Sequence, residues 1–310
     1  MEKKILLPLD QSSESKNAVK YAARKSSTVN KLNFVLLHVE PMVSSYLKEE
    51  ARKNNKVRKE LELRLKKNHK KAIQLLEPHK EEMVRLGISP DSIKIVSLQR
   101  KLGLAKDIID YAQEQSLDAI LVGRRGKSKL QELFMGSTTA NLVDNSRVVP
   151  IWIVDGKVTS DRILLAVDGS EQSLKILDHV IYLVGDNPNT FLTLYHIETR
   201  GPDYNLVSYD EEKSDALEKV IDQEDEVYIG EYHAKGAQML EDAGIGKDRY
   251  EIRIVKRRRN IGNAILKKAE KDNYGTIVIG RSGVGKSFFM GSVSRYVISR
   301  AVNRAVWLVT

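Results

Sequence analysis

The stretch Ile5-Leu6-Leu7-Pro8-Leu9-Asp10 returns 158 positions later as Ile163-Leu164-Leu165-Ala166-Val167-Asp168. A second stretch, Leu121-Val122-Gly123-Arg124-Arg125-Gly126, returns 157 positions later as Val278-Ile279-Gly280-Arg281-Ser282-Gly283. Two stretches that recur at almost the same distance mark a long internal repeat. Each copy therefore holds an early strand that ends in aspartate and a late strand that runs into a glycine-rich turn.

The length of 310 residues is about twice the usual domain length of roughly 150. We expect one domain over residues 1–155 and a second over residues 160–310. The sequence is 41% apolar and 30% charged, with only 7 prolines. This composition gives each domain enough apolar side chains for a core and lacks the signature of disorder.

Short apolar runs alternate with helix-forming segments in the same order in both copies. The runs that predict buried strands are 4–9, 34–39, 93–98, 119–122 and 150–154 in the first copy, and 162–167, 191–196, 250–255, 276–279 and 306–309 in the second. Strands that alternate with helices form parallel sheets with right-handed crossovers. The expected fold is α/β, with two open, doubly wound, parallel five-stranded sheets and helices on both faces. A charged helical stretch over 44–86 should break near Pro78, because proline lacks the backbone N–H.

The last predicted strand of each copy is very apolar and carries one tryptophan, Trp152 or Trp307. An open apolar strand edge invites aggregation. We therefore expect the two last strands to pack together, so that the copies form an internal pseudo-dimer.

The net charge of +9 is unevenly distributed. The basic segment, residues 48–71, has eleven lysines and arginines against four glutamates, whereas the acidic segment, residues 208–244, has twelve acidic residues against three lysines. The segments occupy equivalent places in the two copies, and a DNA-binding face is not expected to have an acidic counterpart in its duplicate. We therefore do not expect nucleic acid as a partner. Mutual attraction, within the chain or across a homodimer, and two solvated helix faces both stay open.

The sequence contains no cysteine, which excludes disulfides, thiolate catalysis and cysteine-ligated metals. It has no run of 18 apolar residues, and a strand pattern starts directly after Met1-Glu2. We expect neither a membrane span nor a signal peptide, and hence a cytoplasmic protein with no membrane partner.

Residues suited to an anion site follow two strands that a parallel sheet brings to one edge. Asp10 ends the first strand, and Gly123 and Gly126 follow the fourth, with Gly136-Ser137-Thr138 opening the next helix. Glycine lets backbone N–H groups approach phosphate, and a helix N-terminus adds free amides and a positive dipole end. The pattern predicts an anion cradle opposite a carboxylate. Asp10 and its repeat Asp168 are also compatible with simple caps of the helices that follow them.

With these motifs the chain resembles the universal stress protein family, over almost all of both copies. Nucleotide-binding members carry Gly-x2-Gly-x9-Gly-Ser/Thr and an aspartate at the end of the first strand, and their dimers pair the last strand antiparallel. The resemblance implies two domains of this family and a bound adenine nucleotide, ATP or AMP, with Mg²⁺ as a possible companion ion. In the first copy it implies a site made of Pro8, Leu9, Asp10, Val39, Gly123, Arg125, Gly126, Gly136, Ser137 and Thr138.

In the second copy the implied site residues are Asp168, Gly280, Gly283, Gly291 and Ser292. Only seven residues separate Gly283 from Gly291, two fewer than in the first copy. This shorter loop argues against triphosphate geometry there, so we expect the better site in the first copy.

Residues Gly280 to Ser287 also match the P-loop pattern of glycine, four residues and Gly-Lys-Ser. A P-loop enzyme needs a later strand with an acidic magnesium ligand. The 23 residues after Ser287 contain no aspartate or glutamate. We therefore interpret the match as accidental.

No pattern for a catalytic triad, paired carboxylates or a side-chain metal site is visible among the residues. Two of the six histidines, His38 and His196, recur at one strand-end position, which favours a role in packing or backbone bonding. We expect a nucleotide-binding regulator with a protein client that the sequence does not name. The alternatives are a nucleotide-free scaffold and a slow ATPase.

Overall fold

The structure, a computed structural model, describes residues 2–124, 136–197, 215–255, 260–281 and 290–310. The chain divides into two compact units. Unit 1 contains residues 1–159 together with the late segment 298–308 and residue 310, and unit 2 contains residues 160–297 and 309.

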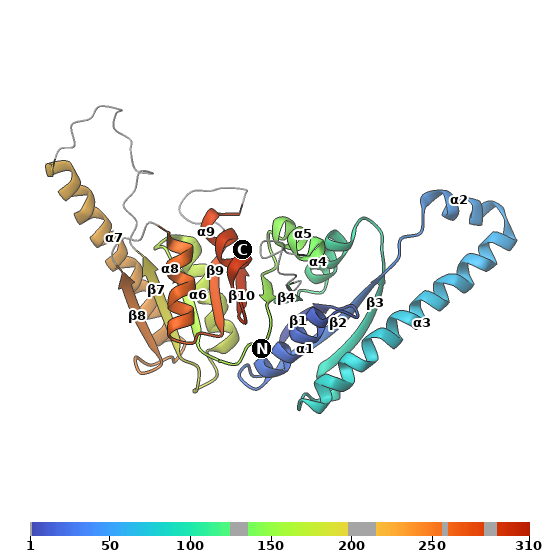
Figure 1. Ribbon diagram of the computed structural model, residues 1–310, viewed down its shortest axis with the longest axis horizontal. Helices are drawn as coiled ribbons and strands as arrows, with labels where there is room; N and C mark the ends of the chain where they lie inside the picture. The colour runs from blue at the N-terminus through green and yellow to red at the C-terminus, as the bar shows by residue number, and fades with distance from the viewer. Residues whose placement is uncertain (1, 125–135, 198–214, 256–259, 282–289) are drawn as a thin grey trace. The chain divides into compact units, whose positions relative to one another are not determined.

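Strands and helices alternate along unit 1 (Figure 1). In chain order the elements are β1 (Lys3–Pro8), α1 (Ser13–Ser26), β2 (Leu32–Glu40), α2 (Ser45–Lys53), α3 (Asn55–Arg85), a 3-10 turn η1 (Pro90–Ser92), β3 (Ile93–Gln99), α4 (Leu104–Glu114), β4 (Ala119–Gly123), α5 (Ser137–Asn145), β5 (Ile151–Val154) and, from the end of the chain, β10 (Ala305–Val309).

The sheet of unit 1 has the order β3-β2-β1-β4-β5, with all of these pairs parallel, and continues with β10 antiparallel to β5. The order reverses between β1 and β4. Right-handed crossovers on the two sides of this switch point place their helices on opposite faces. In agreement, α1 packs against α3, and α4 packs against α5. This confirms the predicted α/β fold and places the carboxyl ends of β1 and β4 next to each other.

The predicted pairing of the two last strands is present. Trp307 of β10 lies opposite Trp152 of β5, and their rings stack with centroids 4.0 Å apart. Both side chains are buried, so the strand edge expected to aggregate is covered. The last strand of the second sequence copy, apart from Val309, is thus grouped with unit 1.

Unit 2 contains β6 (Ile163–Val167), α6 (Glu171–Val184), β7 (Leu192–Ile197), α7 (Asp215–Asp242), β8 (Tyr250–Val255), α8 (Ile261–Lys271), β9 (Thr276–Gly280) and most of α9 (Ser292–Arg300). Its strands follow the order β9-β6-β7-β8 in parallel pairs. This order repeats that of β4-β1-β2-β3 in unit 1.

The predicted break of the charged helical stretch near Pro78 is wrong. Helix α3 continues through Pro78, and the break falls at Asn54. The Asn54 side chain accepts hydrogen bonds from the amides of Lys56 at 2.9 Å and Val57 at 3.3 Å, so it caps α3. Pro78 lies on the exposed face, where water can satisfy the carbonyl that loses its partner.

Two histidines of unit 2 predict how stability depends on pH. Burial lowers the pKa of His179 from 6.5 to about 4, and burial together with the nearby His196 lowers that of His233 from 6.5 to about 4. Between these values the unfolded chain binds more protons than the folded one, so stability is lost as the pH falls from about 6.5 to about 4. For each histidine, the free energy of unfolding should fall by at most about 3 kcal/mol over this pH range. Urea unfolding across this range tests this, and the His179→Leu/His233→Leu variant should show a flatter profile; an unchanged slope would contradict the assignment.

Candidate functional site

A cleft of about 180 Å³ opens at the carboxyl ends of β1, β2 and β4 in unit 1. It lies at the switch point, where parallel α/β sheets bind ligands. Its lining includes eight of the predicted site residues, Pro8, Leu9, Asp10, Val39, Gly123, Gly136, Ser137 and Thr138. The other two predicted for this copy, Arg125 and Gly126, lie outside the described residues. The fold thus gathers residues from four separate parts of the sequence.

Asp10 organises the turn that leads from β1 into α1. Its Oδ1 accepts hydrogen bonds from the Ser12 amide at 3.0 Å, from the Ser15 hydroxyl at 2.7 Å and from the Ser12 hydroxyl. Ser12 in turn caps α1 by accepting from the Ser15 amide at 3.2 Å. The cap of α1 is therefore Ser12 and not Asp10, and Asp10 has a structural role one step away, because it holds the capping serine in place. Asp10 also lines the cleft.

The same turn recurs in unit 2. Asp168 Oδ1 accepts from the amide and hydroxyl of Ser170, at 3.1 and 2.6 Å, and from the Ser173 hydroxyl at 2.7 Å. Recurrence of the aspartate therefore has a structural cause in both copies and is not by itself evidence of two binding sites.

Two histidines hold the backbone of the Asp10 turn. The Nδ1 atom of His38, on β2, lies 3.0 Å from the Leu9 carbonyl oxygen, as expected for a backbone-bonding histidine. The Nε2 atom of His79, on α3, lies 3.0 Å from the Asp10 carbonyl oxygen. His79 is buried and lies 69 positions from Asp10, so only the packing of α3 reveals this role.

Position 123 requires a glycine for a steric reason that the sequence did not reveal. A Cβ at this position would overlap the backbone oxygen of Glu14 and would lie 2.6 Å from its carbonyl carbon. The first turn of α1 thus packs directly on the end of β4. We predicted this glycine for phosphate approach, but close helix packing already requires it.

The N-terminus of α5 also lines the cleft. Gly136 is its N-cap, with φ −56°, and the Thr139 hydroxyl donates to the Gly123 carbonyl at 3.1 Å. This bond ties α5 to the end of β4. The first amides of a helix have no acceptor within the helix, so the Gly136-Ser137-Thr138 end of the cleft is suited to an anion.

The cleft is chemically divided. Leu9, Val39, Leu104 and Val122 supply apolar surface, while the α5 N-terminus and the hydroxyls of Ser137 and Thr138 supply hydrogen-bond donors. This lining suits a ligand with an apolar part and an anionic part.

In unit 2 the equivalent strand end is built in the same way. The Ser294 hydroxyl donates to the Gly280 carbonyl at 2.6 Å, and the Gly291 amide donates to the Arg281 carbonyl at 2.9 Å. Ser292 starts α9. Gly283 lies outside the described residues, as does most of the P-loop match.

The comparisons with known proteins agree with this architecture. The family model described as "Universal stress protein family" matches residues 1–155 and 159–309. The chain belongs to this family. It is 30% identical over 165 residues, 51% of its own length and 97% of the relative, to universal stress protein MJ0577 of Methanocaldococcus jannaschii.

Two solved structures match nearly the whole tandem chain. A universal stress protein from Archaeoglobus fulgidus has a TM-score of 0.63 at 21% identity, covering 98% of this chain and 97% of that one. A functionally unknown Pseudomonas aeruginosa protein, PA1789, has a TM-score of 0.61 at 15% identity, with coverage of 99% and 92%. At these identities the likeness shows the shared fold.

Within the described ranges, no group of three or more histidine, aspartate or glutamate side chains is arranged to hold a metal ion. No helix in the same part of the chain is both long and apolar enough to cross a membrane.

Proposed function

We propose that the unit 1 cleft binds an adenine nucleotide, ATP or AMP, and that this stress protein is a regulator without strong enzymatic activity. The observation that carries the proposal is the divided cleft, with an apolar wall around Val39 and Leu104 and a donor-rich wall at Gly136-Ser137-Thr138. A nucleotide has the same division, because its base is flat and its phosphates are anionic.

The walls suggest how the nucleotide would lie. The base fits between the Pro8-Leu9 backbone and Val39, the ribose lies near Asp10, and the phosphates meet the first turn of α5. Each phosphate oxygen bonded by an amide or hydroxyl gains a charge-assisted hydrogen bond. A Mg²⁺ ion would be held mainly by the phosphates, as this ion commonly is in nucleotide sites.

The residues around the cleft favour binding over chemistry. Three titratable side chains among the described residues line it: Asp10 is engaged in the α1 turn, Glu14 accepts from the Ser13 hydroxyl, and His38 lies against the Leu9 carbonyl. The hydroxyls of Ser12 and Ser15 donate to Asp10 Oδ1, but Ser12 also caps α1 and the three side chains together form the turn that starts the helix, which favours a structural role over a nucleophilic one. Slow hydrolysis is therefore the most activity we expect, and a nucleotide-free scaffold is the alternative.

For the location of the protein, the proposal is the cytoplasm. The cysteine-free sequence suits a reducing cytoplasm.

Calorimetric titration of the full chain with ATP and AMP tests the proposal. We expect about one strong site per chain, because the shorter loop of the second copy makes its site empty or limited to a shorter nucleotide. No heat of binding for either nucleotide at millimolar concentration would favour the scaffold.

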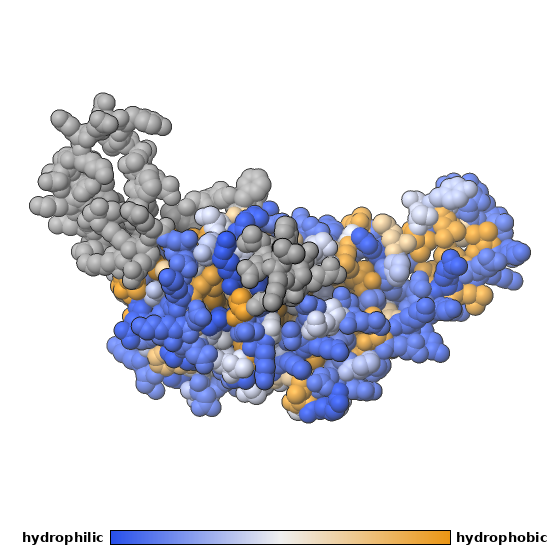
Figure 2. Space-filling model, in the orientation of Figure 1, coloured by the Kyte–Doolittle hydropathy of each residue, from blue (hydrophilic) through white to orange (hydrophobic). Residues whose placement is uncertain are grey.

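The charged segments predict a salt-sensitive assembly, either within the chain or in a homodimer. The hairpin of α2 and α3 contains the basic segment (residues 48–71), and Figure 2 shows hydrophilic residues over much of its surface. Exposed ion pairs contribute only about 0–1 kcal/mol each and are screened by salt. Sedimentation at low and high ionic strength should therefore show a smaller or less compact species at high salt. If mass and stability do not change with salt, both segments are solvated surface only.

A further inference from the structure

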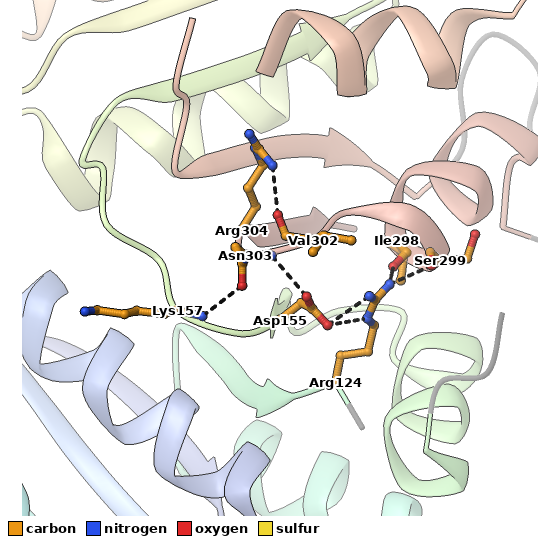
Figure 3. Close-up of polar contacts among 8 residues, drawn as sticks. All are labelled: Arg124, Asp155, Lys157, Ile298, Ser299, Val302, Asn303 and Arg304. Carbon is orange, nitrogen blue, oxygen red and sulfur yellow. Dashed lines mark hydrogen bonds and ion pairs between the residues drawn. The ribbon is translucent and has the colours of Figure 1, made fainter. Parts of the chain in front are cut away.

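A buried ion pair joins the end of β4 to the residue that follows β5, and both of its members hydrogen-bond the late segment 298–308, within unit 1 (Figure 3). Arg124 donates from Nε and Nη2 to Asp155 Oδ1, at 3.0 and 2.8 Å. Its Nη1 donates to the carbonyl oxygens of Ile298 and Ser299, at 2.9 and 2.6 Å. Both charged side chains are at most 10% exposed. The guanidinium thus binds a carboxylate and the C-terminal end of α9 together.

Asp155 extends the contact to the turn before β10. Its Oδ2 accepts from the Asn303 amide at 3.0 Å, and its own amide donates to the Arg304 carbonyl at 3.0 Å. The Asn303 side chain accepts from the Lys157 amide at 3.3 Å. We call Arg124, Asp155 and Asn303 the edge cluster, because they lie beside the edge at which β10 pairs with β5.

The conformation of Asn303 is decisive. Its φ is +52°, in the left-handed region that asparagine tolerates and β-branched residues avoid. This conformation points the Asn303 amide at Asp155 Oδ2. A residue that cannot adopt the left-handed conformation cannot direct its backbone amide toward Asp155 Oδ2.

The two sequence copies differ at these positions. Arg124 corresponds to Arg281, but Asp155 corresponds to Thr310 and Asn303 corresponds to Val148, when the last strands are aligned on Trp152 and Trp307. Only a pairing of β5 with the 298–308 segment therefore brings all three members of the edge cluster together. If β5 paired with a second copy of itself, Val148 would have to take the place of Asn303.

We infer that the edge cluster is the specificity determinant of the β5 edge, which selects the 298–308 segment and rejects the β5 strand of a second chain. In the rejected pairing, valine resists the left-handed conformation, and Asp155 Oδ2 loses an amide donor at a buried position. A buried charged group that loses a partner is costly. The selected partner is a strand that follows a helix C-terminus and a left-handed asparagine.

Disulfide trapping in the full chain tests this inference, because the natural sequence has no cysteine. Trp152 faces Trp307 in the ladder, with Ile153 facing Val306, so in a β5–β5 pair Ile153 would face Ile151 of the other chain. Chains with Ile153→Cys are mixed with chains with Ile151→Cys and oxidised. We expect almost no mixed disulfide while the edge cluster is intact. When both chains also carry Asp155→Thr and Asn303→Val, the yield of mixed disulfide should rise about tenfold or more.

Asn303→Gly is the matched control, because glycine adopts the left-handed conformation freely and keeps the amide for Asp155. It should trap as little mixed disulfide as the intact chain. If the Asn303→Val chain does not fold, Asp155→Thr alone should still raise the mixed product. Equal trapping in the intact and altered chains, or trapping in Asn303→Gly equal to that in Asn303→Val, would overturn the inference.

Discussion

Replacing Gly136 by valine is expected to weaken ATP binding by about a hundredfold, because the new side chain blocks phosphate from the first turn of α5. The loss of one or two charge-assisted hydrogen bonds at about 1.5–3 kcal/mol each gives this size. The glycine has φ −56°, which any residue adopts, so the fold should survive. Calorimetry with ATP measures the loss, and circular dichroism checks the fold. Undiminished affinity in the folded variant would remove α5 from the proposed site.

Lys286→Ala is the contrasting variant. Lys286 lies in the P-loop match, outside the described residues. If that match were a working P-loop, this variant would lose most ATP affinity, because the lysine would meet the terminal phosphates. We expect only a small change. Loss with Lys286→Ala but not with Gly136→Val would revive the NTPase interpretation.

Trp307→Ala is expected to cost about 3–5 kcal/mol of stability, the usual range for removing a large buried aromatic side chain. Trp307 is fully buried and stacks on Trp152, and its Nε1 donates to the Tyr21 hydroxyl at 2.9 Å. The change opens a cavity between β10, β5 and α1. Urea unfolding followed by far-ultraviolet circular dichroism measures the cost.

The Tyr21→Phe variant separates the contribution of the Trp307–Tyr21 hydrogen bond from that of the Trp152–Trp307 stack. It removes the acceptor of the Trp307 indole N–H and leaves the rings in place, so we expect a smaller loss of about 1–3 kcal/mol. A loss below about 1 kcal/mol for Trp307→Ala would mean that the β5–β10 pairing does not depend on the tryptophan stack.

Sequence patterns predicted the parts of this fold that rest on local periodicity and on the repeat. The strand ends at Asp10 and Gly123 and the start of α5 followed from short motifs. The tryptophan pair followed from the duplicated last strand. These features are readable because each is encoded within a few neighbouring residues.

The features that were missed depend on contacts between distant residues. His79 reaches the Asp10 carbonyl only because α3 packs over the sheet. Arg124 meets Ile298 and Ser299 across more than 170 positions, and no local motif announces such a pair. Pro78 misled the helix prediction, because the cost of a missing hydrogen bond depends on exposure, which tertiary packing sets.

Nucleotide binding by this chain can be checked without any added ligand, by extracting the small molecules from the freshly purified full chain and separating them by chromatography. We predict that ATP, ADP or AMP is released from the wild-type chain, in an amount of about one per chain or less, and that the Gly136→Val chain releases much less. A wild-type chain that releases no adenine nucleotide, and takes up none after incubation with millimolar ATP, would contradict the account.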